Sequence, residues 1–159
     1  MHFVLKILRI MLLIIVVIGI AAFLYRDHIE RSPLQKEFLT GVAEPLPDGF
    51  YKGSSPSLPV GSWRGKQFNA TEAKGVNVLE SAGKREFVYP FRMVKTKGSR
   101  DHALDVIKID YSLPENPWLL RNFAYDEIVR LADGRYLGKI QIEIIRGFPF
   151  TIGYFWQEK

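Results

Sequence analysis

Two neighbouring acids, Asp126 and Glu127, are the residues of this chain whose types and spacing best suit chemistry. They lie in the alternating run 122–131, which predicts a β-strand, and neighbouring residues of a strand point to opposite faces. If the aromatic residues Phe123 and Tyr125 face a protein core, the carboxylate of Glu127 faces it with them. A carboxylate inside a protein can bind a ligand or transfer a proton, because burial changes its pKa.

A buried Glu127 carboxylate needs a cationic or hydrogen-bonding partner. The neighbouring strands offer Arg92, Lys108 and Lys139 as candidates. The alternative interpretation places Glu127 at the rim of the sheet, where the strand leaves the core and the carboxylate meets water.

Other chemical signatures are absent from the sequence. His102 is the one histidine after residue 31, and its place beside Asp101 favours an exposed turn over a metal or acid–base site. The chain has no cysteine, and zinc sites take three or four ligands from Cys, His or carboxylates. No Gly-x-Ser-x-Gly motif, phosphate-binding loop or dinucleotide fingerprint occurs. The sequence therefore predicts no metal and no cofactor, and it gives no positive indication of an enzyme.

The uncharged segment from Ile10 to Tyr25 predicts a membrane anchor over residues 1–25. A helix of this length spans roughly 24 Å, and the apolar residues before it extend it toward the thickness of a bilayer core. The alternative is a cleaved signal peptide with a small-residue site at 19–21, but the apolar run continues beyond that site. We expect a single-pass membrane protein whose main domain lies outside the cytoplasm, because a short N-terminal tail before a span is typical of signal anchors.

The rest of the chain divides into two parts by composition. Residues 26–60 predict a juxtamembrane helix that restarts at Ser32 and Pro33, followed by a connector rich in proline, glycine and serine. Residues 61–159 predict an antiparallel β domain. The net charge of +5 for the whole chain includes no dense basic cluster with interleaved aromatic residues, so nucleic-acid binding is not expected.

One short helix is expected within the β domain, over residues 69–81. Asn69 and Glu72 have the spacing of a capping box, and an apolar stripe follows them. Farther along, Asp133 and Gly134 separate two alternating runs and predict a hairpin turn.

Alternating apolar residues predict successive strands over the second half of the chain. Short connections between such strands favour an antiparallel meander, and closure into a small barrel removes its exposed edges. The residues that alternation places on one side of the sheet are Phe87, Tyr89, Phe91, Ile107, Ile109, Tyr111, Ile140 and Ile142.

The run Gly61-Ser62-Trp63-Arg64-Gly65 resembles the first strand of the lipocalin-like (calycin) barrels, and in particular the GXWXG-type domains of unknown function. The resemblance implies a barrel in which Trp63 closes one end. It also implies an apolar ligand, since members of these families often bind one, but it transfers no catalytic residues.

These observations together predict a membrane-anchored β-barrel that serves as a binding or interaction module. Its partners would be the lipid bilayer and either an apolar or amphiphilic small molecule or another membrane protein. The alternatives are an accessory subunit of a membrane complex and a small enzyme acting on a lipid-like substrate. The residues expected to line a ligand site are Trp63, Phe91, Ile109, Tyr111, Glu127 and Ile140.

Overall fold

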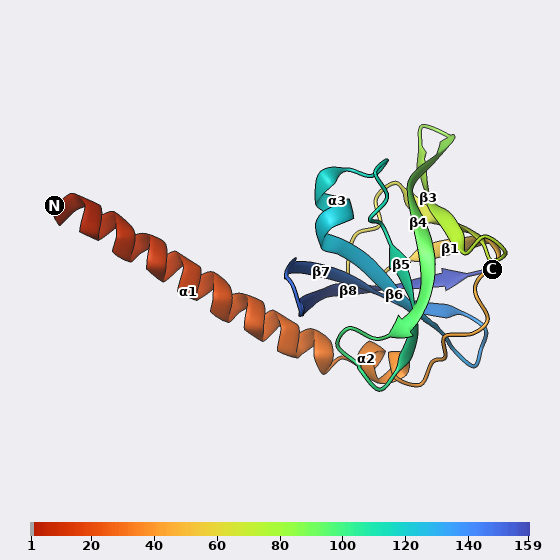
Figure 1. The fold of residues 1–159 in the computed structure, drawn as a ribbon, viewed down its shortest axis with the longest axis horizontal. Helices are drawn as coiled ribbons and strands as arrows, with labels where there is room; N and C mark the ends of the chain where they lie inside the picture. Colours follow the sequence, from red (N-terminus) through yellow and green to blue (C-terminus); the bar gives the residue numbers. More distant parts are fainter. Residues whose placement is uncertain (1) are drawn as a thin grey trace.

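The protein is mainly β, with a closed antiparallel barrel of eight strands in simple sequential order (Figure 1). The computed structural model describes residues 2–159, apart from the side chains of residues 2, 3, 26 and 27. The strands are β1 (Gly49–Ser54), β2 (Trp63–Asn69), β3 (Lys74–Ser81), β4 (Lys84–Lys97), β5 (Asp105–Asp110), β6 (Ala124–Arg130), β7 (Tyr136–Ile145) and β8 (Phe148–Glu158). β8 pairs with β1 to close the barrel. The predicted antiparallel meander is therefore confirmed.

The N-terminal helix α1 (His2–Glu30) projects away from the barrel (Figure 1). Within Val4–Glu30, an 18-residue stretch of this helix has a mean hydropathy of 3.0 and is not buried inside the protein, so the helix is long and apolar enough to cross a membrane. The exposed aliphatic surface of α1 has the character that lipid contact requires.

The C-terminal end of α1 is attached to the barrel wall. The hydroxyl of Tyr25 donates to the carbonyl of Ile152 in β8 at 2.6 Å, and Ile29 is buried against the outer face of the barrel. After a break, helix α2 (Pro33–Phe38) begins where the sequence predicts, with the Ser32 hydroxyl accepting from the amide of Gln35. The Phe38 ring is fully buried at the end of α2.

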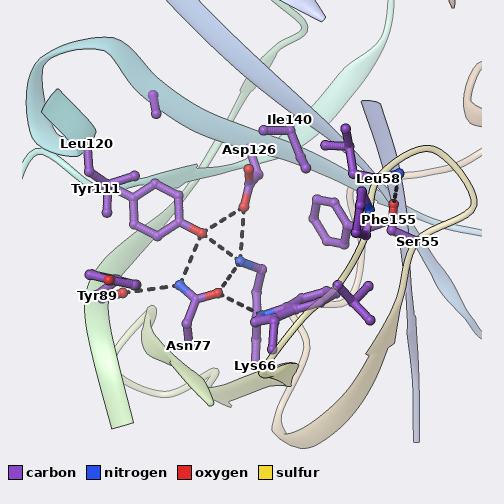
Figure 2. A pocket seen from close by; sticks show the side chains of 14 residues that line it. Ser55, Leu58, Lys66, Asn77, Tyr89, Tyr111, Leu120, Asp126, Ile140 and Phe155 are labelled. Atoms are coloured by element: carbon purple, nitrogen blue, oxygen red, sulfur yellow. Dashed lines mark hydrogen bonds and ion pairs between the residues drawn. The ribbon is translucent and has the colours of Figure 1, made fainter. Parts of the chain in front are cut away.

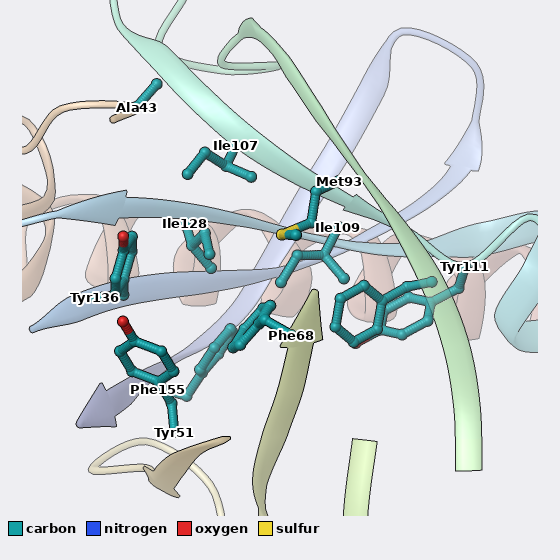
Figure 3. Close-up of a cluster of buried hydrophobic side chains, with 11 residues drawn as sticks. Ala43, Tyr51, Phe68, Met93, Ile107, Ile109, Tyr111, Ile128, Tyr136 and Phe155 are labelled. Carbon is teal, nitrogen blue, oxygen red and sulfur yellow. The ribbon is translucent and has the colours of Figure 1, made fainter. Parts of the chain in front are cut away.

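Two apolar clusters hold the domain together. The first fills the barrel interior (Figure 3), and its rings meet edge to face, as Tyr51 does with Tyr136 at 5.4 Å between ring centroids. The second lies outside the barrel, where Ile29 and Phe38 pack on Val129 and Leu137. Because α2 covers them from outside, β6 and β7 carry buried apolar residues on both faces, unlike strands that have one solvated face.

The expected helix over 69–81 is wrong, because this segment is the turn after β2 followed by strand β3. The capping bond does form, with the Glu72 amide donating to the Asn69 side chain at 3.0 Å, but it closes a turn. Ala73 then adopts a φ of 51°, which ends any helical path. The β-branched residues of the segment pair with β2 and β4 instead.

The barrel also begins earlier than residue 61. Strand β1 lies within the range 26–60 that composition assigned to a connector, and it pairs with both β2 and β8. Gly65 explains how closely β1 and β2 approach each other, because a Cβ at this position would lie 1.9 Å from the carbonyl oxygen of Tyr51. Its φ of 137° also favours glycine.

The expected inward face of β4 is wrong for Phe87, whereas Tyr89 is partly exposed and borders a cavity at the end of the barrel. Tyr89 has a φ of 54°, and the pairing of β3 with β4 shifts register between Gly75 and Asn77. A bulge of this kind exchanges the two faces of a strand. Phe87 is consequently 63% exposed, whereas Phe91, beyond the irregularity, is fully buried.

The expected hairpin at Asp133 and Gly134 is confirmed, since it joins β6 to β7. The amide of Gly134 donates to the carbonyl of Leu131 at 3.0 Å, and Gly134 has a φ of 88°. A left-handed glycine after a tight turn is a common way to close a short hairpin loop.

Candidate functional site

A cavity of about 270 Å³ opens at one end of the barrel (Figure 2). The β1–β2 loop, the bulge of β4 and the short helix α3 (Trp118–Phe123) surround it. Its apolar walls include Leu58, Val60, Leu120, Ile140 and Phe155.

The floor of this cavity is a buried ion pair. The Lys66 ammonium lies 3.0 Å from Asp126 Oδ2, and both side chains are almost completely enclosed. Lys66 comes from β2 and Asp126 from β6, so the pair joins strands on opposite sides of the barrel interior. Separating buried charges of this kind is costly, because either one alone lacks water to stabilise it.

Tyr111 and Asn77 complete the hydrogen bonding of the pair, and these four residues form the inner polar cluster. Lys66 Nζ donates to Tyr111 Oη at 2.6 Å and to Asn77 Oδ1 at 2.8 Å. Tyr111 Oη donates in turn to Asp126 Oδ2 at 2.7 Å. Together with the bond to Asp126, all three N–H groups of Lys66 are used.

Aromatic rings surround the Lys66 ammonium and shield it from water. Its nitrogen lies 5.3 Å from the centroids of Tyr111 and Phe155 and 5.4 Å from that of Phe91. Burial lowers the pKa of Lys66, and Asp126 opposes that change. Burial also raises the pKa of Tyr111 well above its ordinary value, and the neighbouring Asp126 charge raises it further. Tyr111 therefore stays protonated and acts as a hydrogen-bond donor.

One carboxylate oxygen of the inner polar cluster has no donor among the described residues. The bonds from Lys66 and Tyr111 go to Oδ2 of Asp126, and within residues 2–159 no group donates to Oδ1. Asp126 lines the cavity, so a bound molecule can place a hydroxyl or N–H against this oxygen. The arrangement suits a molecule with an apolar body and one hydrogen-bond donor.

The structure brings together only part of the predicted site. Trp63, Tyr111 and Ile140 line the cavity, and the Trp63 indole donates to Asn77 Oδ1 at 3.1 Å. Trp63 is half-buried at the end of the barrel. Phe91 and Ile109 lie in the filled interior instead and do not line the cavity.

Glu127 points to the opposite side of the strand from the cavity. Phe123 belongs to α3, so the strand begins at Ala124, and Asp126 is the acid that shares the inward face with Ile128. The prediction that one acid of this pair faces the interior is thus right, but that acid is Asp126 and not Glu127.

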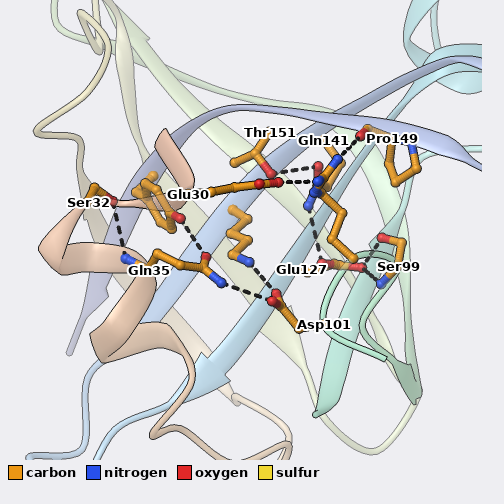
Figure 4. Close-up of polar contacts among 12 residues, drawn as sticks. Glu30, Ser32, Gln35, Ser99, Asp101, Glu127, Gln141, Pro149 and Thr151 are labelled. Carbon is orange, nitrogen blue, oxygen red and sulfur yellow. Dashed lines mark hydrogen bonds and ion pairs between the residues drawn. The ribbon is translucent and has the colours of Figure 1, made fainter. Parts of the chain in front are cut away.

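Glu127 lies in a second buried network, the outer polar cluster, between the barrel wall and the segments that cover it (Figure 4). Its carboxylate accepts from the Ser99 amide at 2.7 Å, from the Ser99 hydroxyl, and from Gln141 Nε2 at 3.3 Å. Lys139, a predicted partner of Glu127, is paired with Asp101 in this cluster. Burial lowers the pKa of Lys139, and the hydrogen bond to Asp101 opposes this decrease.

Sequence reasoning missed Lys66 and Asn77, and it chose Glu127 instead of Asp126 as the interior acid. Lys66 has the same strand parity as Phe68, so alternation alone would place it inside the barrel. Asn77 was missed because its segment was interpreted as a helix.

Comparison with known proteins adds no further assignment. No protein-family model, curated protein or solved structure matches this chain.

Proposed function

We propose that the protein is a membrane-anchored binding module whose barrel holds a small amphiphilic molecule. The observation that carries the proposal is the apolar cavity above the inner polar cluster, with Asp126 Oδ1 as its open acceptor. A concave apolar site with a few polar groups at one end is the usual form of a small-molecule site. The resemblance of Gly61-Ser62-Trp63 to lipocalin-like barrels supports the same interpretation.

Size and charge narrow the class of ligand. The cavity of about 270 Å³ exceeds the roughly 150 Å³ that holds one benzene ring, so a ligand of about one fused ring system or a short chain is expected. Lys66 and Asp126 neutralise each other, so the floor offers no unpaired positive charge to a carboxylate. An uncharged alcohol or amide suits this floor better than a fatty-acid anion does.

The proposed location follows from α1. We take α1 as a retained single span, with the barrel outside the cytoplasm and close to the bilayer. Its hydropathy supports insertion, and the contacts of Tyr25 and Ile29 with the barrel hold the cavity close to the membrane surface.

An enzyme acting on a lipid-like substrate is the second candidate. The Asp126 carboxylate stands beside a tyrosine hydroxyl and a lysine ammonium, which is a combination that can transfer protons. A molecule that is converted in the cavity, rather than released unchanged, would favour this candidate.

The test compares three probes of one shape with the full-length protein in detergent micelles. 2-Naphthol carries a hydroxyl, naphthalene carries no polar group, and 2-naphthoate carries a negative charge. We expect 2-naphthol to bind with a Kd of roughly micromolar, or about −8 kcal/mol, and more tightly than the other two. Tighter binding of 2-naphthoate would contradict the proposed role of Asp126.

Two variants separate the cavity from the rest of the surface. Ile140→Trp places a ring in the cavity and should abolish 2-naphthol binding, whereas Val94→Trp places the same ring on the exposed face of β4 and should leave it intact. Native mass spectrometry of the protein extracted from its own membrane then identifies what it carries. Absence of probe binding, with only protein partners retained, would replace the ligand proposal with an accessory subunit.

A further inference from the structure

Five large apolar side chains are exposed at the end of the barrel that also carries the cavity. They belong to α3 and to the hairpin between β7 and β8, and they define the apolar rim: Trp118, Leu119, Ile144, Ile145 and Phe148. Phe148 is 72% exposed and Ile144 is 74% exposed. Apolar side chains gathered in this way mark an interaction surface more often than a solvated one.

The position of α1 shows what faces this rim. Tyr25 is bonded to Ile152 of β8, and the β7–β8 turn lies a few residues before Ile152 at the start of that strand. Figure 1 shows the tip of the β7–β8 hairpin and α3 on the side of the barrel toward which the N-terminal part of α1 runs. A span that continues in this direction brings the rim to the surface of the bilayer that it enters.

The charges beside the rim suit lipid headgroups. Arg146 at the hairpin tip and Arg121 on α3 are both exposed, and basic side chains near a bilayer surface favour anionic lipids. The nearby Glu143 carboxylate accepts from the Gly147 amide within the hairpin at 2.6 Å. Aromatic and aliphatic side chains flanked by arginines are typical of surfaces that dip into the interfacial layer.

We infer that the apolar rim inserts into the interfacial layer of the same bilayer that α1 enters. Leu120 of α3 lines the cavity while its neighbours Trp118 and Leu119 belong to the rim, so the mouth of the cavity then opens onto lipid. An amphiphilic molecule reaches the inner polar cluster from the membrane rather than from water. The insertion itself rests on the proposed anchoring by α1 and does not depend on the identity of the ligand.

The experiment uses single cysteines, because the natural chain has none. Full-length Phe148→Cys and Leu119→Cys variants carry a nitroxide label in nanodiscs of phosphatidylcholine with a minor share of phosphatidylglycerol. Collision rates with oxygen, which concentrates in lipid, are compared with those of a water-soluble nickel chelate. We expect both labels to be protected from nickel and accessible to oxygen.

Two control positions make the outcome decisive. Phe87→Cys replaces a similarly exposed aromatic residue on the β3–β4 hairpin, which Figure 1 shows on the side away from α1, and its label should remain in water. Ile14→Cys reports the insertion of α1 itself. If the label at position 14 lies in lipid while the labels at positions 148 and 119 lie in water, the rim inference is overturned and the anchor stands. If the label at position 14 lies in water, the anchor itself is overturned.

Discussion

Asp126 and Glu127 are neighbours on β6 and both are buried, yet they belong to clusters of different kinds. The Asp126 carboxylate bonds to Lys66 of β2 and to Tyr111, which directly follows β5. Both bonds reach Oδ2, and Asp126 also lines the cavity. Glu127 bonds to Ser99 in the β4–β5 loop and to Gln141 of β7. The inner polar cluster borders a cavity, whereas the outer polar cluster is covered by α2 and the β4–β5 loop.

Burial and charge are therefore alike at the two acids, and what separates them is that only Asp126 borders a cavity. The outer polar cluster attaches α2 and the β4–β5 loop to the wall, since Gln35 of α2 donates to Asp101 at 2.9 Å and accepts from Tyr154 at 2.7 Å. Each of these bonds joins parts of the fold that are distant in sequence. The inner polar cluster attaches no covering segment, and under the proposed function its polar groups serve a ligand.

The largest expected effect comes from breaking the inner ion pair on one side. Lys66→Met leaves the Asp126 carboxylate buried without its cation, so the free energy of unfolding should fall by about 3–5 kcal/mol. Denaturant unfolding of the full-length protein in micelles, followed by circular dichroism, measures the change. Replacing both partners, as Lys66→Met with Asp126→Leu, should restore much of the stability while 2-naphthol binding stays lost.

A double variant as unstable as the single one would contradict this comparison. It would mean that the inner polar cluster holds the barrel together in the way that the outer one does. Its polar character would then need no ligand to explain it.

A smaller effect is expected at Glu127. Glu127→Gln keeps the shape of the side chain but can place its amide N–H against the Ser99 N–H, which is itself a donor. The unsatisfied buried contact should lower the free energy of unfolding by about 1–3 kcal/mol. Binding of 2-naphthol should be unchanged, whereas Asp126→Asn should weaken it. Equal loss of binding in the two variants would remove the functional distinction between the two acids.

The smallest effect is expected from Tyr125→Phe and appears mainly at alkaline pH. Burial raises the pKa of Tyr125 from its ordinary value near 10 to about 12. The stability linked to this shift is fully present below pH 10 and is lost as pH rises toward 12, because the unfolded tyrosine ionises first. The variant should therefore lose stability less steeply over that window.

At neutral pH the same variant should lose about 1 kcal/mol, since Tyr125 donates to the Ser99 hydroxyl at 2.8 Å. Thermal unfolding at several pH values measures both effects. If the variant and the natural protein lose stability equally steeply between pH 10 and 12, Tyr125 does not control this alkaline loss.

The sequence is sufficient to predict the meander because period-two alternation extends over most strands, as in Ile107, Ile109 and Tyr111, all of which face the interior. It is insufficient at β3, where a local capping pattern at Asn69 is real but closes a turn. It is also insufficient at β4, because the bulge at Tyr89 depends on pairing with a partner strand.

The candidate site is harder to predict for a related reason. Both faces of β6 are covered, so apolar alternation does not tell which acid faces the interior. Lys66 breaks the expected pattern of an apolar barrel interior, and only its contacts with Asp126 and the surrounding rings explain its burial. Alternation along their strands predicts the cavity-lining places of Tyr111 and Ile140, whereas that of Trp63 is expected from the resemblance of its motif to lipocalin-like barrels.

Closure of the barrel by β1 and β8 also determines when the domain can fold during synthesis. The closing pairs, such as Lys52 with Glu158, join the first strand to the last, so they cannot form until the ribosome has made β8. Helix α1 and strands β1 to β7 are made before that. Until then β1 and β7 present unpaired edges, which favour aggregation, and distant pairings form slowly. Closure of the barrel therefore waits for the synthesis of its last strand.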